Sequence, residues 1–130
     1  MHDNKEALMK YRMDMARDKL RSAKILLDSE SYKDSISRSY YAMFTAVRAI
    51  LAVDEVDFKK HAGVISYFQR EYIKTGKFDK RYSKYLSNAF RIRNDTDYAD
   101  FYIVKRQDAE EQYERAVELL RAIEEYLSGH

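Results

Sequence analysis

The chain has 130 residues, of which 45% are hydrophobic and 35% are charged, with a formal net charge of +2. This length suits one domain, residues 1–130, built around a single core. The absence of cysteine excludes disulfides and thiolate metal sites. The charged N-terminal stretch and the lack of any run of about 18 apolar residues predict neither a signal peptide nor a membrane span. We therefore expect a cytoplasmic protein that does not contact membranes.

The composition predicts an all-α fold. Proline is absent and glycine occurs only three times, so few residues interrupt a helix. Apolar residues recur at helical spacing, which indicates an up-and-down bundle of four to five helices. The expected helices, in chain order, run over about residues 4–28, 32–53, 61–74, 79–93 or slightly beyond, and 105–127.

The second expected helix carries distinct faces. Its core stripe consists of Ile36, Tyr40, Met43, Val47 and Ile50, and a flank of serine and alanine allows close approach of another helix. Tyr41 and Arg48 lie two turns apart on another side and could line a cleft. The pair Tyr40–Tyr41 is more typical of core packing than of substrate stacking.

Charge is unevenly distributed along the chain. Residues 58–93 carry ten Lys or Arg against two Asp or Glu, whereas residues 94–130 carry four against ten. A basic segment with interleaved aromatic residues could bind RNA through phosphate contacts and base stacking; the aromatic residues are Tyr67, Phe68, Tyr72, Phe78, Tyr82 and Tyr85. The alternative is that the basic helices neutralise the acidic C-terminal helix.

The stretch RIRNDTDY, residues 91–98, concentrates polar chemistry after an amphipathic helix. If the helix continues, Arg93 and Asp97 share a face and can pair, and Tyr98 projects about 140° away from Arg93. If it breaks, as the cap-forming residues NDTD suggest, Arg93 and Tyr98 could turn toward a common point. A purely structural alternative is that Asp95 or Asp97 caps a following short helix.

The chain resembles the HEPN superfamily, in particular its small stand-alone members encoded beside a minimal nucleotidyltransferase. Four stretches carry the resemblance: KLRSAKILLDSESYKDSISRSYYAMFTAVRAIL, KKHAGVISYFQREYIKTGKF, RIRNDTDY and DAEEQYERAVELLRAIEEYL. The resemblance implies a helical homodimer. It also implies a metal-independent endoribonuclease without a cofactor, often the toxin of a toxin–antitoxin or defence pair whose antitoxin is the nucleotidyltransferase.

The family signature is an arginine, a polar residue and, a few residues later, a histidine. Carried over, these positions fall on Arg93, Asn94 and Tyr98, so a tyrosine replaces the histidine. Arg93 can stabilise the charge of a phosphate under attack, and Asp97 would orient Arg93 or Tyr98. Tyrosine has an unperturbed pKa near ~10 and is a poor base at neutral pH. Either the nuclease is weaker, another group replaces the histidine, or the fold only binds.

His61 begins the third expected helix within the sequence KKH. Together with Lys60 it could bring cationic groups to a phosphate near a helix N-terminus. The alternative is an exposed or capping histidine. No ligand spacing indicates a metal site.

The preferred hypothesis is a HEPN homodimer that cleaves or binds RNA. One alternative is a non-catalytic module that holds a nucleotide or docks the nucleotidyltransferase, with Tyr98 as a site to which AMP is attached. Another is a structural dimer in which residues 91–98 form only a capped turn. The sequence leaves these alternatives open.

Overall fold

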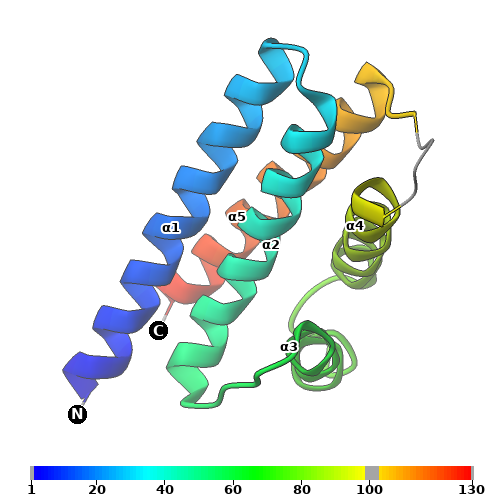
Figure 1. The fold of residues 1–130 in the computed structure, drawn as a ribbon. Helices are drawn as coiled ribbons and strands as arrows, with labels where there is room; N and C mark the ends of the chain where they lie inside the picture. Colours follow the sequence, from blue (N-terminus) through cyan, green and yellow to red (C-terminus); the bar gives the residue numbers. More distant parts are fainter. Residues whose placement is uncertain (1, 99–102, 130) are drawn as a thin grey trace.

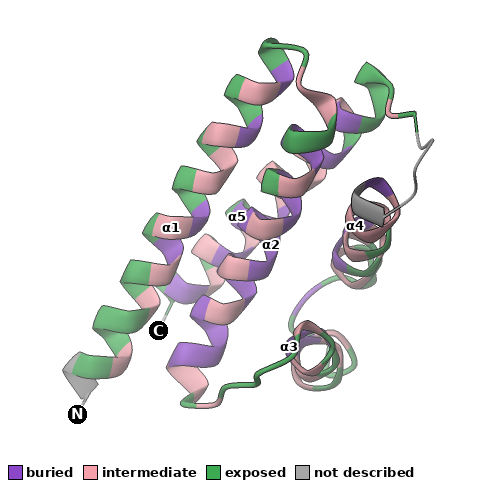
Figure 2. Ribbon diagram, in the orientation of Figure 1, coloured by how far each residue is buried: buried purple, intermediate pink, exposed green. Residues whose placement is uncertain are grey.

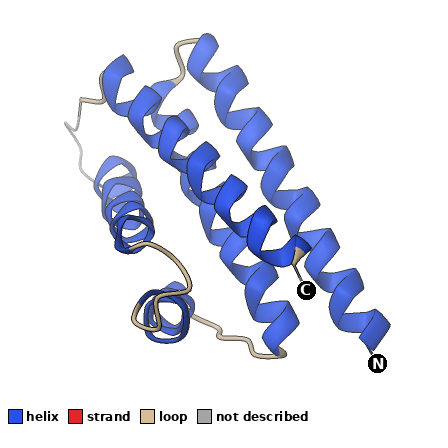
Figure 3. Cartoon of the chain, turned by 180° about the vertical axis from the view of Figure 1, so that it is seen from behind, coloured by secondary structure: helices blue, strands red, loops and turns tan. Residues whose placement is uncertain are grey.

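The structure is a computed structural model that describes residues 2–98 and 103–129, with side chains described for residues 4–96 and 103–129. Its elements are α1 (His2–Asp28), α2 (Tyr32–Asp54), α3 (His61–Phe68), the π-helix η1 (Gln69–Ile73), α4 (Lys80–Tyr98) and α5 (Arg106–Ser128). No strand occurs within these described ranges (Figure 3). The all-α bundle is confirmed.

The long helices α1, α2 and α5 lie side by side, and α2 runs antiparallel to α1 (Figure 1). Helices α3 and α4 are seen almost end-on both from the front and from behind, so they lie steeply across the long helices (Figures 1 and 3). Within the described part of the chain, no helix combines the length and the apolar character that crossing a membrane requires.

Helix α2 is the centre of the core, and buried residues run along most of its length (Figure 2). The predicted stripe is confirmed, since Tyr40, Met43, Val47 and Ile50 are fully buried. The flank of small residues is buried as well, and the Ser35 hydroxyl donates a hydrogen bond to the Ala23 carbonyl of α1 at 2.8 Å. Small side chains thus allow α1 and α2 to pack closely.

Helices α1 and α2 both end at a residue other than glycine in the left-handed conformation. Glu30 follows α1 with φ 64°, and Glu55 follows α2 with φ 58°. After each of them, a backbone N–H reaches back over the last turn, from Ser31 to the Leu26 carbonyl and from Val56 to the Leu51 carbonyl. This arrangement satisfies carbonyls that would otherwise lack partners. The predicted ends of these helices are confirmed, although a non-glycine residue carries the left-handed conformation.

The third predicted helix is present over its expected length, but its second half has a different form. The α-helical part ends at Phe68, and η1 follows, closed by a hydrogen bond from the Lys74 N–H to the Gln69 carbonyl at 2.9 Å. Gly76, with φ 80°, follows the element and allows the chain to turn away from it.

The aromatic residues of the basic segment serve the core. Phe68, Tyr72 and Phe78 are buried, so the prediction that they stack on RNA bases is wrong. Tyr67, which is half-buried, donates its hydroxyl hydrogen bond to Asp54. The alternative was that the basic helices neutralise the acidic C-terminal helix. The ion pair between Arg81 of α4 and Glu118 of α5, at 3.1 Å, is an example of such neutralisation.

Helix α4 continues through the polar stretch to Tyr98. The cap expected at Asp95 is therefore wrong, because Asp95 lies inside the helix and pairs with Arg91 at 3.5 Å, one turn earlier. The Thr96 hydroxyl donates to the Arg93 carbonyl at 3.0 Å, which satisfies this polar side chain without ending the helix.

Candidate functional site

His61, the first residue of α3, is held by two aromatic neighbours from α2. Its ring stacks on Phe44 with centroids 4.1 Å apart, and Nδ1 lies 2.9 Å from the Tyr40 hydroxyl. The imidazole is half-buried, and Lys60 occupies the N-cap position instead. The expectation of an exposed or capping histidine is therefore wrong.

Tyr41 links His61 to Arg93. The Tyr41 and His61 rings meet edge to face at 6.0 Å, and the Arg93 guanidinium carbon lies 5.1 Å from the Tyr41 ring centroid. Arg93 also donates a long hydrogen bond of 3.4 Å to the side chain of Asn94. Side chains from α2, α3 and α4 thus meet at one place, because α3 and α4 both pack against α2 (Figure 1).

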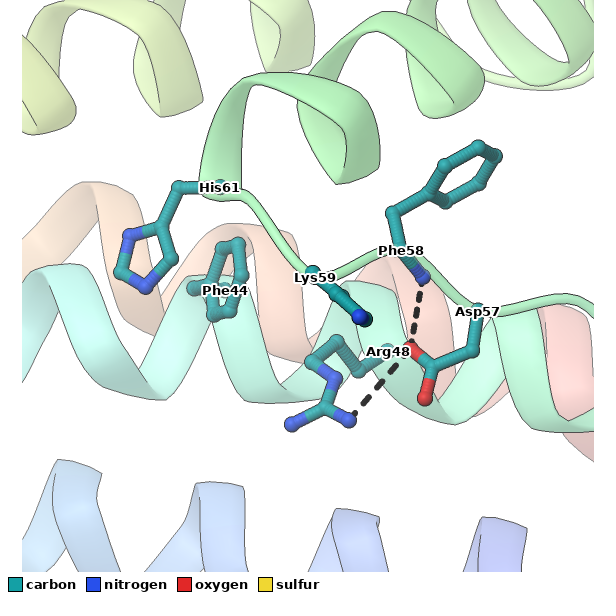
Figure 4. A pocket seen from close by; sticks show the side chains of 6 residues that line it. All are labelled: Phe44, Arg48, Asp57, Phe58, Lys59 and His61. Carbon is teal, nitrogen blue, oxygen red and sulfur yellow. Dashed lines mark hydrogen bonds and ion pairs between the residues drawn. The ribbon is translucent and has the colours of Figure 1, made fainter.

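Two surface cavities adjoin His61. One, of about 530 Å³, is lined by Phe44, Arg48, Asp57, Phe58, Lys59 and His61 (Figure 4). The other, of about 450 Å³, lies toward α1 and includes Tyr11, Lys19 and Tyr41 in its lining. Phe44, Arg48 and His61 line both cavities, so a ligand passing from one cavity to the other crosses these side chains.

The cavities carry excess positive charge. Among the described side chains that line them, Asp57 is the one carboxylate, whereas the cations are Arg12, Lys19, Arg48 and Lys59. Asp57 lies 3.5 Å from the Arg48 guanidinium (Figure 4) and 3.9 Å from that of Arg12. Arg12 is further anchored by a 2.8 Å hydrogen bond to the Arg48 carbonyl.

Burial and neighbouring charge perturb the ionisable groups of the site. Burial, together with the guanidinium groups of Arg93 and Arg48, lowers the pKa of His61 below its usual value. Burial, with a further contribution from Tyr41, raises the pKa of Tyr40. At neutral pH His61 is therefore uncharged and Tyr40 keeps its proton.

The structure brings together some of the predicted site residues and leaves others apart. His61, Tyr41 and Arg48 line the cavities, and Arg93 lies over the Tyr41 ring with Asn94 beside it. Lys60 is exposed and lines neither cavity. The side chains of Asp97 and Tyr98 lie outside the described residues.

Residues that the sequence analysis missed complete the site: Arg12, Phe44, Asp57 and Lys59. Phe44 lies one turn after Tyr40 and Tyr41 and before Arg48, so its spacing on α2 was a usable signal. Arg12 and Asp57 carried no such signal, because they are far apart in the chain and meet only through the packing of α1 on α2.

An all-α protein with two adjoining cation-rich, aromatic-lined cavities suits the binding of a phosphorylated ligand. Arginine presents paired donors that match phosphate oxygens, and aromatic rings offer faces for bases.

Comparison with known proteins identifies the family. The HEPN domain family matches residues 9–126, and the chain belongs to this family. A Thermotoga maritima protein, named "UPF0332 protein", is 34% identical over 125 residues, which cover 96% of this chain and 95% of that protein. A Methanocaldococcus jannaschii protein, named "Putative toxin MJ0142", is 33% identical over 115 residues, covering 88% of this chain and 78% of that protein. The resemblance expected from the sequence is confirmed.

Proposed function

We propose that this protein binds RNA across the two cavities and cleaves it without a metal ion. The observation that carries the proposal is that Arg48 and His61 line both cavities, while Arg93 lies over the ring of Tyr41, which contacts His61. Cationic groups outnumber the one carboxylate among the described lining side chains. A phosphodiester at this point would be held by guanidinium groups.

The arginines have different roles in this proposal. Arg48 lines both cavities and would bind the phosphate in the ground state. Arg93, stacked over Tyr41, would stabilise the additional negative charge that develops as the 2′-oxygen attacks phosphorus. Stacking on an aromatic face fixes the plane of a guanidinium group, so less freedom is lost when the phosphate binds.

The comparisons support a toxin-type role. The matched M. jannaschii protein carries the name "Putative toxin MJ0142", and we propose that the present protein is the toxin of a toxin–antitoxin pair. We further propose that it acts as a homodimer and that its antitoxin is a minimal nucleotidyltransferase. Sedimentation of the purified protein tests the dimer, and co-purification after co-expression tests the partner.

The decisive experiment is RNA cleavage by purified protein in the presence of EDTA. Arg93→Ala should reduce cleavage by roughly 10- to 150-fold, because a hydrogen bond to a charged group contributes about 1.5–3 kcal/mol. Arg48→Ala should weaken RNA binding. It should also reduce the slope of log affinity against log salt concentration by about one, as expected for the loss of one phosphate contact. The matched control is Arg121→Ala, which removes an exposed arginine of α5 that lines neither cavity.

Cleavage that survives in Arg93→Ala would remove Arg93 from the mechanism. RNA binding without cleavage by the folded wild-type protein would instead favour the non-catalytic module. In that case mass spectrometry after co-expression with the nucleotidyltransferase would show whether Tyr98 carries AMP, and an unmodified Tyr98 peptide would count against that role.

A further inference from the structure

We propose that His61, held at Nδ1 by the Tyr40 hydroxyl, presents its Nε2–H to the RNA phosphate and donates the proton to the leaving 5′ oxygen. This inference rests on the proposed function and names the proton donor of the same site. In this assignment His61 is a catalytic residue and Tyr40 is a positioning residue.

The hydrogen bond between Tyr40 and His61 determines which nitrogen of the imidazole carries the proton. Tyr40 is fully buried, and its hydroxyl lies 2.9 Å from Nδ1. A buried hydroxyl without an acceptor costs about 1–3 kcal/mol, so in the free protein the hydroxyl donates to the Nδ1 lone pair. A neutral imidazole carries a single N–H, which must then lie on Nε2.

The position of the ring follows from its neighbours. Stacking on Phe44 and the bond to Tyr40 fix two sides of the imidazole. The ring also lines both cavities, where Phe44 and Arg48 are the other shared residues (Figure 4). A phosphodiester that spans the cavities therefore passes beside the imidazole, with nucleosides on either side.

The charged groups around the His61 ring come from α1, α2, α4 and the segment before α3. The charged groups at the cavities and at Tyr41 are Arg12, Lys19, Arg48, Asp57, Lys59 and Arg93. The uncharged but ionisable neighbours are Tyr40 and Tyr41. Burial lowers the pKa of His61, and the guanidinium groups of Arg93 and Arg48 lower it further, so the free imidazole is neutral.

Bound phosphate reverses this balance. Its negative charge offsets the guanidinium groups and favours the imidazolium form, so His61 takes up a proton from solvent when RNA binds. In the charged ring Nδ1 also carries a proton, and the Tyr40 oxygen accepts that hydrogen bond instead. Tyr40 can therefore hold the ring in both protonation states, although in the charged state its hydroxyl hydrogen loses Nδ1 as an acceptor, and the attraction between imidazolium and phosphate must offset that cost.

Cleavage then forms one bond to phosphorus and breaks another. The 2′-oxygen forms a bond to phosphorus and its proton passes to water. The bond between phosphorus and the 5′ oxygen breaks, and the departing oxygen takes the proton from Nε2 of the imidazolium. The products are a 2′,3′-cyclic phosphate and a 5′-hydroxyl, and His61 is left neutral with its proton on Nδ1. Proton exchange with water then restores the tautomer with the proton on Nε2, to which Tyr40 donates.

The first test uses a 2′-O-methyl oligonucleotide, which can bind but lacks the attacking hydroxyl. NMR titration, assigned with His61→Gln, should show that saturating oligonucleotide raises the pKa of His61 by about one unit or more. By linkage, the oligonucleotide should then bind roughly tenfold more tightly below the pKa of His61 in the free protein than above the pKa of His61 in the complex. His61→Gln should abolish that part of the pH dependence, whereas the matched control His130→Gln should retain it.

The second test separates catalysis from positioning. We expect His61→Gln to lower cleavage by about 10²- to 10⁴-fold. In Tyr40→Phe, ¹⁵N shifts of the imidazole should report a mixture of tautomers in place of one, and the pH profile of cleavage should shift with the NMR pKa. Circular dichroism of each variant checks that the helices remain folded. His61→Asn provides a second substitution that removes the imidazole, for use if His61→Gln does not fold.

The outcomes distinguish the two proposals. If the wild-type protein cleaves RNA and His61→Gln cleaves within about threefold of it, the role of His61 is refuted while the nuclease stands. A pKa of His61 that does not respond to bound oligonucleotide also refutes it. If the wild-type protein neither binds nor cleaves RNA, both proposals fail.

Discussion

Replacing Asp57 with asparagine should strengthen RNA binding. Asp57 is the one carboxylate among the described side chains that line the cavities, and it pairs with the guanidinium groups of both Arg48 and Arg12. It therefore opposes the attraction of these arginines for phosphate. The asparagine oxygen can still accept the 2.9 Å hydrogen bond that the Phe58 N–H donates to Asp57, so the local backbone should keep its course.

The magnitude follows from Coulomb's law. A phosphate bound on the far side of Arg48 would lie roughly 6–7 Å from the Asp57 carboxylate, because the carboxylate is 3.5 Å from the guanidinium. The side chain of Asp57 is 58% exposed, so an effective dielectric constant of about 40–80 is appropriate. The repulsion removed is then about 0.6–1.3 kcal/mol, which corresponds to roughly three- to ninefold tighter binding.

Fluorescence anisotropy with a 2′-O-methyl oligonucleotide measures this effect, with titrations at about 20 mM and 200 mM salt. The gain should shrink at the higher salt because the charges are partly exposed and are screened. Lys10→Gln, an exposed change on α1 outside both cavities, alters the net charge by one unit in the opposite direction, so its effect with the sign reversed measures the contribution of net charge alone. Unchanged or weaker binding by Asp57→Asn at low salt would contradict the reasoning, because Asp57 would then orient the arginines rather than compete with phosphate.

Other predictions concern stability. Met43→Ala should lower the free energy of unfolding by about 2–5 kcal/mol in urea titrations, because Met43 is fully buried on α2. Glu30→Gly should raise it by roughly 0.5–1 kcal/mol in the same assay, because glycine adopts the positive φ of this position without steric cost. The lowered pKa of His61 means that the unfolded chain binds this proton more readily, so stability should fall as the pH drops through about 6.5 toward the folded pKa. His61→Gln should flatten that part of the stability profile.

Hydrophobic spacing was sufficient to predict the helices, because their buried faces are long and regular. The fifth helix, expected over residues 105–127, is found at Arg106–Ser128. The extension of α4 was harder to anticipate, since asparagine, aspartate and threonine also form caps. Its local interactions, the Arg91–Asp95 pair and the hydrogen bond from Thr96, depend on side-chain conformations that a residue pattern does not specify.

The site was predictable only in part. Arg93 came from a family signature, and Tyr41 and Arg48 from their spacing on one helix. The environment of His61 depends on how α3 packs on α2, which places the ring on Phe44 and against the Tyr40 hydroxyl. The two lysines that precede His61 indicated a surface residue. Long-range packing determined the burial and the pKa.

The continuity of α4 bears directly on where the proton donor lies. Position 98, onto which the sequence resemblance carries the family histidine, is five residues after Arg93 in one uninterrupted helix, so it lies about 140° around the helix axis. Arg93 meets an imidazole through Tyr41, and that imidazole comes from α3. Charge stabilisation and proton transfer can therefore be supplied by separate helices of this fold. A tyrosine at position 98 is then compatible with catalysis, because the proton is provided by His61 across the cavity.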